Sequence, residues 1–299
     1  MDRRKFLKTA AIGSIGLAVP PLGPLEALAS PIASPDLAVA RGASPDQTVK
    51  AAIEALGGMR RFISRGDIVV VKPNIGWDRV PEQAGNTNPT VVATLVKLCY
   101  DAGAKNVKVF DRPVNDPRRC YVQSGIEAAA RAVDGDVQFV DDRKFRDMEI
   151  RGLSLKTWPL YTEIFEADKV INVPIAKHHS LAKLTLSMKN WMGIMGGSRR
   201  MIHQKLDESL VDLAMKVKPV LTVLDAVRVL TDNGPQGGDL RDVKKLDTVV
   251  AGVDQVAIDA YGATLFGMQG KDLGYVRIAA EHKFGVMDLG RLKIRTLQV

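Results

Sequence analysis

The stretch DKVINVPIAK, residues 168–177, decides the fold. Its run of aliphatic and β-branched residues is too apolar to expose either side, so we predict a strand that is buried on both faces. Such strands belong to parallel sheets, because the crossover connections between parallel strands place helices over both faces. The stretch ends at Lys177, and His178 and His179 follow it directly. Polar side chains are therefore expected where this strand ends.

Segments with the patterns of strands and helices alternate on both sides of this stretch. Before it, we expect strands over residues 67–74, 106–113 and 137–142, and helices over 88–103 and 121–135. After it, we expect helices over residues 206–219, 254–267 and 273–285, and strands over 221–230, 248–254 and 291–299. The sequence therefore predicts an α/β fold, with a mostly parallel sheet and crossover helices on both faces.

The N-terminal segment, residues 1–29, has the three parts of an export signal. Arg3 and Arg4 form a twin arginine, an apolar stretch follows them, and Ala27-Leu28-Ala29 is a small-x-small cleavage site. The segment resembles a twin-arginine signal, which implies the twin-arginine translocase as a partner and a periplasmic or extracellular location. Its apolar part is short and interrupted by prolines, so we expect cleavage and no stable membrane span afterwards.

Two further regions complete the expected organisation of the chain. Residues 30–46 are rich in Pro, Ala and Ser, and we predict a loose leader there. Residues 47–299 are expected to form one α/β domain, with one or two lobes.

Composition excludes several classes of function. The net charge is +8, and removal of four cations and two anions with residues 1–29 leaves +6. A basic exported protein meets anionic metabolites and phosphate groups more readily than DNA. Only 5% of the residues are aromatic, and no basic run is interleaved with aromatics, so no nucleic-acid partner is expected. Cys99 and Cys120 are the only cysteines, too few for the four thiolates of an iron–sulfur cluster.

Polar residues recur at or near the ends of the predicted strands. Lys72 and Asn74 end one strand, Asp111 ends the next, and Lys177 ends the stretch described first. Asp225 lies within the strand expected over 221–230. Because ligands of open α/β sheets bind beyond the carboxyl ends of the strands, these side chains are expected along one rim.

The segment that follows the first stretch is strongly basic. Between Asp168 and Asp207 there is no carboxylate, while seven lysines and arginines occur. A bound anion would neutralise this excess, and the amides of residues 196–198 could contribute to its binding. We therefore predict an anionic small molecule, phosphate or carboxylate, as the partner. The alternative is a basic band on the solvated surface.

The candidate residues divide into ligand-binding and catalytic groups. A histidine would move a proton and a carboxylate would orient that histidine. The catalytic candidates are His178, His203, Asp111 and Asp259. The ligand-binding candidates are Lys72, Asn74, Lys177, His179, Lys189, Asn190, Arg199, Arg200 and Asp225.

Two alternative functions remain open at this point. A divalent metal could be held by His178, His203 and Asp225 in an enzyme of racemase or hydrolase type, although the surrounding cations oppose it. Adjacent histidines in an extended segment point in opposite directions, so only one of His178 and His179 is expected to face the site. The other alternative is an exported binding protein without turnover, since no nucleophile elbow, P-loop or His-Glu-x-x-His segment is present.

Five blocks of the sequence resemble the family catalogued as domain of unknown function 362. They are VVVKPNIGWD (69–78), NTNPTVVATLVKLCYDAGAKNVKVFDRP (86–113), DKVINVPIAKHHSLAKLTLSMKNWMGIMGGSRRMIH (168–203), VLDAVRVLTDNGPQGG (223–238) and VVAGVDQVAIDAYGATLFG (249–267). The resemblance implies an α/β fold with one shared site, but no settled reaction.

Two details qualify what these resemblances imply. Many members of that family carry ferredoxin-like cysteine segments, and this chain has none, so the resemblance implies no cluster here. The order Lys189, Gly196, His203 also resembles the cofactor segment of nickel-dependent lactate racemases. That likeness implies racemisation or another proton transfer on a carbon acid.

Overall fold

The computed structural model describes residues 34–299. The predicted export signal, its cleavage site and the first part of the predicted leader lie outside the described residues. No helix among residues 34–299 is both long enough and apolar enough to span a bilayer.

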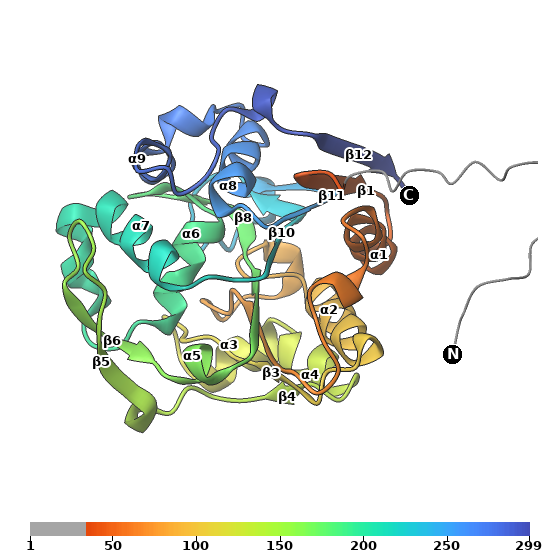
Figure 1. The fold of residues 1–299 in the computed structure, drawn as a ribbon, viewed down its shortest axis with the longest axis horizontal. Coiled ribbons are helices and arrows are strands. Elements are labelled where there is room, and N and C mark those ends of the chain that lie inside the picture. Colours follow the sequence, from red (N-terminus) through yellow and green to blue (C-terminus); the bar gives the residue numbers. More distant parts are fainter. Residues whose placement is uncertain (1–33) are drawn as a thin grey trace, which may run out of the picture. The chain divides into compact units, whose positions relative to one another are not determined.

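A ten-stranded mixed sheet forms the centre of the described domain (Figure 1). Its main path has the order β12-β1-β11-β10-β7-β2-β3-β4; off this path, β8 pairs with β10, and β9 pairs with β8. The strands are β1 (Leu37–Arg41), β2 (Ile68–Pro73), β3 (Asn106–Val109), β4 (Asp136–Val137), β7 (Lys169–Val173), β8 (Ile175–His179), β9 (Lys183–Thr185), β10 (Leu221–Leu230), β11 (Val243–Gly252) and β12 (Ile294–Gln298). A separate hairpin pairs β5 (Phe145–Glu149) with β6 (Thr157–Tyr161).

Most neighbouring strands run parallel. The exceptions are β11, which is antiparallel to both β1 and β10, and the pair formed by β8 and β9. The predicted mostly parallel α/β sheet is therefore confirmed. Parallel β2, β3 and β7 end at the same edge, and this edge carries the residues that follow them in the sequence.

Alternate residues of the strands enter two different hydrophobic cores. In β7, Val170 packs into one core, and Ile171 and Val173 pack into the other, so this strand is buried on both faces as predicted. Helices α1 (Pro45–Ala55) and α2 (Pro89–Ala102) cover one face (Figure 1). The opposite face is covered by α6 (Ser187–Asn190), α7 (Leu206–Lys216), α8 (Gln255–Thr264) and α9 (Gly274–Glu281).

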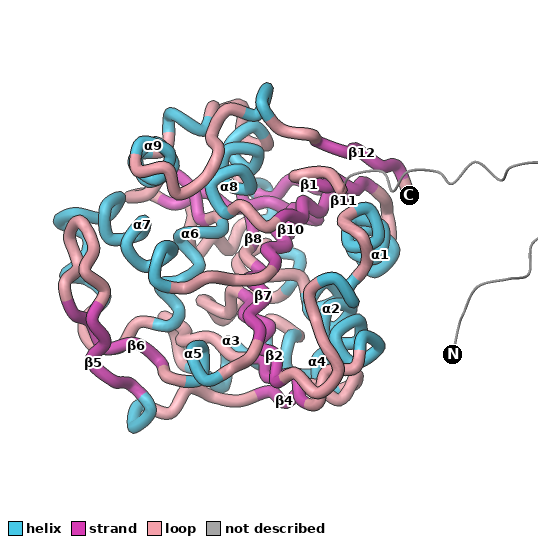
Figure 2. The backbone as a smooth tube through the Cα atoms, in the orientation of Figure 1, coloured by secondary structure: helices cyan, strands magenta, loops and turns pink. Residues whose placement is uncertain are grey.

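The stretch that decided the fold is divided into two strands. Figure 2 labels them separately as β7 and β8. Pro174, which has no N–H to donate to the sheet, separates the two strands. Its carbonyl oxygen instead accepts a hydrogen bond of 2.8 Å from Asp225 N. After the break, β8 turns back through β9 and leads to α6. This turn carries the basic segment back over the edge of the sheet.

The predicted helix over 121–135 is likewise divided. The structure has α3 (Pro117–Gln123) and α4 (Ile126–Arg131) instead of one helix. Gly125 between them has a φ of 70°, a left-handed conformation that interrupts helical geometry and favours glycine. The strand expected over 137–142 is limited to β4.

The prediction of a loose leader over residues 30–46 was wrong for its described part. Strand β1 is buried except at Arg41, and it lies between β11 and β12. Helix α1 then begins at Pro45. The local composition gave no sign of this, because the strands that pair with β1 come from the other end of the sequence.

Candidate functional site

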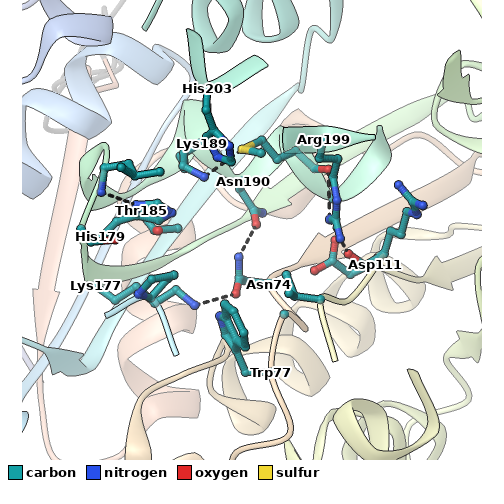
Figure 3. Close-up of a pocket in the computed structure, with 18 of the residues that line it drawn as sticks. Asn74, Trp77, Asp111, Lys177, His179, Thr185, Lys189, Asn190, Arg199 and His203 are labelled. Carbon is teal, nitrogen blue, oxygen red and sulfur yellow. Dashed lines mark hydrogen bonds between the residues drawn. The ribbon is translucent and has the colours of Figure 1, made fainter. Parts of the chain in front are cut away.

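A cavity of about 500 Å³ lies at the edge where the parallel strands end (Figure 3). Loops after β2 and β3, strand β8, helix α6 and the 3-10 segment Arg199–Lys205 supply its walls. It brings together most of the residues predicted as a site. Those that line it are Asn74, Asp111, Lys177, His179, Lys189, Asn190, Arg199, Arg200 and His203.

The carboxylate of the cavity, Asp111, is already neutralised. Lys72 Nζ lies 2.7 Å from Asp111 Oδ1, and both side chains are buried. The other oxygen of Asp111 accepts a hydrogen bond of 2.6 Å from Ile75 N. Gly193 packs directly against this group, since a Cβ there would lie 1.7 Å from Asp111 Oδ1. Asp111 therefore contributes little uncompensated negative charge to the cavity, and it does not orient a histidine as predicted.

A chain of hydrogen bonds crosses the cavity from Lys72 to Lys177. Asn190 Oδ1 accepts from Lys72 Nζ at 3.3 Å and from Asn74 Nδ2 at 3.1 Å. Asn74 Oδ1 in turn accepts from Lys177 Nζ at 3.1 Å, and Lys177 also donates to Gly85 O at 2.6 Å (Figure 3). The amides thus hold both ammonium groups in place; Asp111 neutralises Lys72, whereas the acceptors of Lys177 carry no charge.

Lys189 differs from these lysines in what it contacts. Only 7% of the residue is exposed, and the described part of the chain gives its Nζ one hydrogen-bond partner, Met192 Sδ, at 2.8 Å. A thioether is a weak acceptor. Burial, with a further contribution from nearby Arg199, lowers the pKa of Lys189 to about 7. The side chain is thus a buried amine without an anionic partner in the described structure.

The pKa of Lys177 is lowered in the same way. Burial is the main cause, the charge of Lys189 adds to it, and together they bring the pKa of Lys177 to about 7. The charge of Lys189 therefore acts on Lys177, and the two lysines repel each other when both are charged. An anion placed between them would remove this repulsion.

Arginines form the other side of the cavity. Arg199 donates to the carbonyl oxygens of Arg112 and Pro113, at 2.9 and 2.7 Å, and Arg112 donates to Met195 O at 2.7 Å. Neither guanidinium is paired with a carboxylate of residues 34–299. Their positions are fixed by backbone oxygens, and their charges stay uncompensated.

The two adjacent histidines point to different sides, as predicted. His179 lines the cavity, whereas His178 is absent from its wall and accepts a hydrogen bond of 3.0 Å from Gly234 N. His179 Nδ1 accepts from Leu181 N and Ala182 N, so the neutral ring carries its proton on Nε2. Burial, followed by the charge of Lys189, lowers the pKa of His179 to about 3.

His203 is the more exposed histidine of the wall. Burial of part of the ring and the charge of Lys189 lower its pKa below the usual value. Because its ring is neutral at neutral pH, this imidazole can accept a proton.

Asp225 and Asp259 lie outside the cavity. Asp259 accepts hydrogen bonds from Ser187 N at 2.6 Å and Met188 N at 3.0 Å, at the start of α6. Asp225 accepts from Asn88 N and Val227 N, at 2.7 and 2.9 Å. The predicted roles of orienting a histidine or binding a ligand are therefore not supported by their positions. Asp259 instead fixes the start of α6, which leads to the cavity, and Asp225 fixes the backbone at Asn88 and Val227.

The alternative metal site is not assembled. His178, His203 and Asp225 do not converge, and no three His, Cys, Asp or Glu side chains within the described range are grouped to hold a metal ion. Cys99 and Cys120 are each buried as free thiols.

Sequence reasoning missed several residues of the wall. Trp77 and Arg112 line the cavity; Trp77 follows the strand predicted over 67–74, and Arg112 lies near the end of the strand predicted over 106–113. Their positions in the loops after β2 and β3 were the available signal. Thr185 and Pro235 also line the cavity, where strand β9 and the loop after β10 place them.

A model of one protein family matches most of this domain. The model for the domain of unknown function DUF362 matches residues 69–264. The chain belongs to the DUF362 family. The DUF362 region contains every residue of the cavity wall, from Asn74 to Pro235.

Two individual proteins are similar to this DUF362 chain. The thylakoid-associated protein sll1697 of Synechocystis sp. is 30% identical over 221 residues, which cover 71% of this chain and 67% of that protein. Among solved structures, the lactate racemase apoprotein from Thermoanaerobacterium thermosaccharolyticum aligns with a TM-score of 0.42 and 13% identity. That alignment covers 73% of this chain and 54% of the other, so the chain spans about half of that protein's length.

Proposed function

We propose that the cavity binds a small organic anion, with a carboxylate or phosphate group, and transfers a proton on it. The observation that carries this proposal is Lys189, a buried ammonium whose hydrogen-bond partner in the described chain is a thioether. Burying an uncompensated charge is costly, and a bound anion would offset this cost. We also propose that the protein acts after export, on the basis of residues 1–29.

The distribution of charge supports an anion over a cation. Lys177, Lys189, Arg112, Arg199 and Arg200 line the cavity, and its carboxylate, Asp111, is paired with Lys72. An anion entering this cavity meets several cations that carboxylates have not neutralised.

The wall also supplies groups for proton transfer. His203 is neutral at neutral pH and can accept a proton, while His179 can donate a hydrogen bond from Nε2. Trp77 and Met192 provide apolar surface, which favours an organic anion over an inorganic one.

Ligand binding can be tested by thermal shift and titration calorimetry. The probes are inorganic phosphate, acetate, lactate and phosphoglycolate. An anion at about a hundred times its Kd should stabilise the protein by about 2.7 kcal/mol. Lys189→Met should weaken binding by about 1.5 to 3 kcal/mol, the usual contribution of a hydrogen bond to a charged group.

Lys205→Met is the matched control. Lys205 belongs to the same basic segment but is exposed and absent from the cavity wall, so its substitution should leave affinity unchanged. Equal weakening by Lys189→Met and Lys205→Met would show that the segment acts only as a basic surface band.

A further inference from the structure

We propose that Lys189 is a nucleophile that forms a Schiff base with the carbonyl carbon of a small 2-oxo acid. This inference rests on the proposed function, because the cavity must first hold the carboxylate of that acid. It adds a covalent step and a substrate class to anion binding.

Lys189 and Lys177 differ in the hydrogen bonds that their amines make. Lys177 Nζ donates to two oxygen atoms, Asn74 Oδ1 and Gly85 O, and these bonds fix the position of its amine. Lys189 Nζ has no oxygen partner in the described chain and contacts only the sulfur of Met192. An amine that donates to no strong acceptor is free to rotate, so its lone pair can face a ligand.

The neighbours of Lys189 favour the neutral amine that nucleophilic attack requires. Its pKa of about 7 leaves a large fraction unprotonated at neutral pH, unlike an ordinary lysine. Desolvation and an adjacent cation, here Arg199, are the established ways in which proteins activate a lysine for attack on a carbonyl group.

The cavity can place a 2-oxo acid with its carbonyl carbon near Lys189. The charge of Arg199 lowers the pKa of Lys189, and the charge of Lys189 lowers the pKa of Lys177. Both cations therefore lie near the amine and can hold the carboxylate of the acid. Trp77 offers an apolar wall for the carbon chain of the acid (Figure 3). In a 2-oxo acid the carboxylate is bonded directly to the carbonyl carbon, so a cation beside Lys189 can hold the carboxylate while the amine reaches the carbonyl carbon.

The reaction balances without an oxidant or a reductant. The lone pair of Lys189 Nζ forms a bond to the carbonyl carbon, and the π electrons of the C=O bond move to the oxygen. His179 Nε2–H can donate a hydrogen bond to that oxygen, and His203 can carry protons from nitrogen to oxygen. The C–O bond then breaks. Both amine protons leave with the oxygen as water, and a C=N bond to Lys189 remains.

Reductive trapping with borohydride tests this step on the unaltered protein. Pyruvate and 2-oxoglutarate are the oxo-acid probes, and lactate is the control that has no carbonyl group. We expect a stable secondary amine on Lys189, located by mass spectrometry of peptides, and no adduct with lactate. The yield should be half-maximal near pH 7, well below the pH at which the amine of an ordinary lysine loses its proton.

The variants and the thermal shift separate the possible results. Lys189→Arg should abolish the adduct, and Lys205→Arg should preserve it. An adduct on Lys177, or equally on exposed lysines, would overturn the assignment to Lys189. If pyruvate and lactate both raise the melting temperature but no adduct forms, the Schiff base is refuted and anion binding stands. If no probe binds and none is trapped, both proposals fail.

Discussion

Lys189 shows how a single buried residue can reduce stability for the sake of function. Its ammonium is almost fully buried and lacks an anionic partner among the described residues. Groups of this kind weaken the unliganded protein and are retained where a ligand needs them. The same side chain is therefore expected to affect stability and binding in opposite directions.

Replacing Lys189 by Met should stabilise the unliganded protein near neutral pH. The folded-state pKa of Lys189 is about 7, below the ordinary value of 10.5, so between these values the unfolded chain binds more protons than the folded one. Stability should therefore rise with pH across this window, by up to about 1.4 kcal/mol per pH unit for this group. Lys189→Met should remove that part of the slope. Urea unfolding at pH 7 and pH 9, in buffer without phosphate or carboxylate, measures both effects.

Lys177 contributes a similar slope, which should persist in the Lys189→Met variant, though reduced because the two lysines repel each other. Lys205→Met serves as the exposed control and should leave the slope intact. A Lys189→Met protein that is less stable than the parent at pH 7 would contradict the view that this amine is an uncompensated buried charge.

Residue type and position predicted several cations of the cavity but not the roles of the candidate carboxylates. The sequence predicted Lys177 and Asn74 as site residues because polar residues at the ends of parallel strands gather at one edge of the sheet. The role of Asp259 could not be predicted, because its hydrogen-bond partners are the backbone amides of residues 187 and 188, far away in the sequence. A carboxylate that binds backbone and one that binds a ligand look alike in a sequence.

Helix α6 illustrates positioning at the scale of an element. It has only four residues, too few to hold an orientation by itself, and it carries Lys189 and Asn190 into the cavity. Asp259 accepts hydrogen bonds from the first two amides of this helix. The carboxylate thus sets the direction in which Lys189 enters the site.

Asp259→Ala should therefore weaken ligand binding as well as the fold. It leaves two buried amides unpaired, at a cost of about 1 to 3 kcal/mol for each. Asp225→Ala is the matched control, because Asp225 also binds two backbone amides but does not hold α6. Both variants should melt earlier, and only Asp259→Ala should lose anion affinity in calorimetry below its melting temperature. Equal losses of affinity would mean that general destabilisation, not the orientation of α6, is responsible.

The periodic elements were predictable, and their interruptions were not. Apolar runs and helical spacing indicated β2, β10, α7 and α8 at nearly their observed positions. The breaks at Pro174 and Gly125 depend on single residues whose effect is decided by neighbouring strands and helices. The hairpin of β5 and β6 was missed because its residues are partly exposed and show no strong alternation.

At the scale of the whole molecule, the largest error concerned the start of the domain. Residues 37–41 were included in the predicted leader, yet they form a buried strand. Pairing with β11 and β12 decides this, and such long-range pairing leaves no trace in a local window. The α/β class was nevertheless predictable, because it depends on alternation along the entire chain.

Export remains a prediction for the whole molecule. Replacing Arg3 and Arg4 together by Lys should leave the protein unprocessed in the cytoplasm, since the resemblance implies that the translocase recognises the guanidinium pair. Cell fractionation with immunoblotting measures the distribution. The control is replacement of Lys5 and Lys8 by Arg, which preserves both the charge and the twin arginine. Normal export of the Arg3/Arg4 variant would refute the signal.

The position of β1 also has a consequence for the order of events during synthesis. Both neighbours of this strand, β11 and β12, lie within residues 243–298. Residues 37–41 therefore emerge from the ribosome long before either strand that pairs with β1 has been synthesised. During translation this strand must wait unpaired beside the N-terminal segment, and this edge of the sheet closes only after residue 298 has left the exit tunnel.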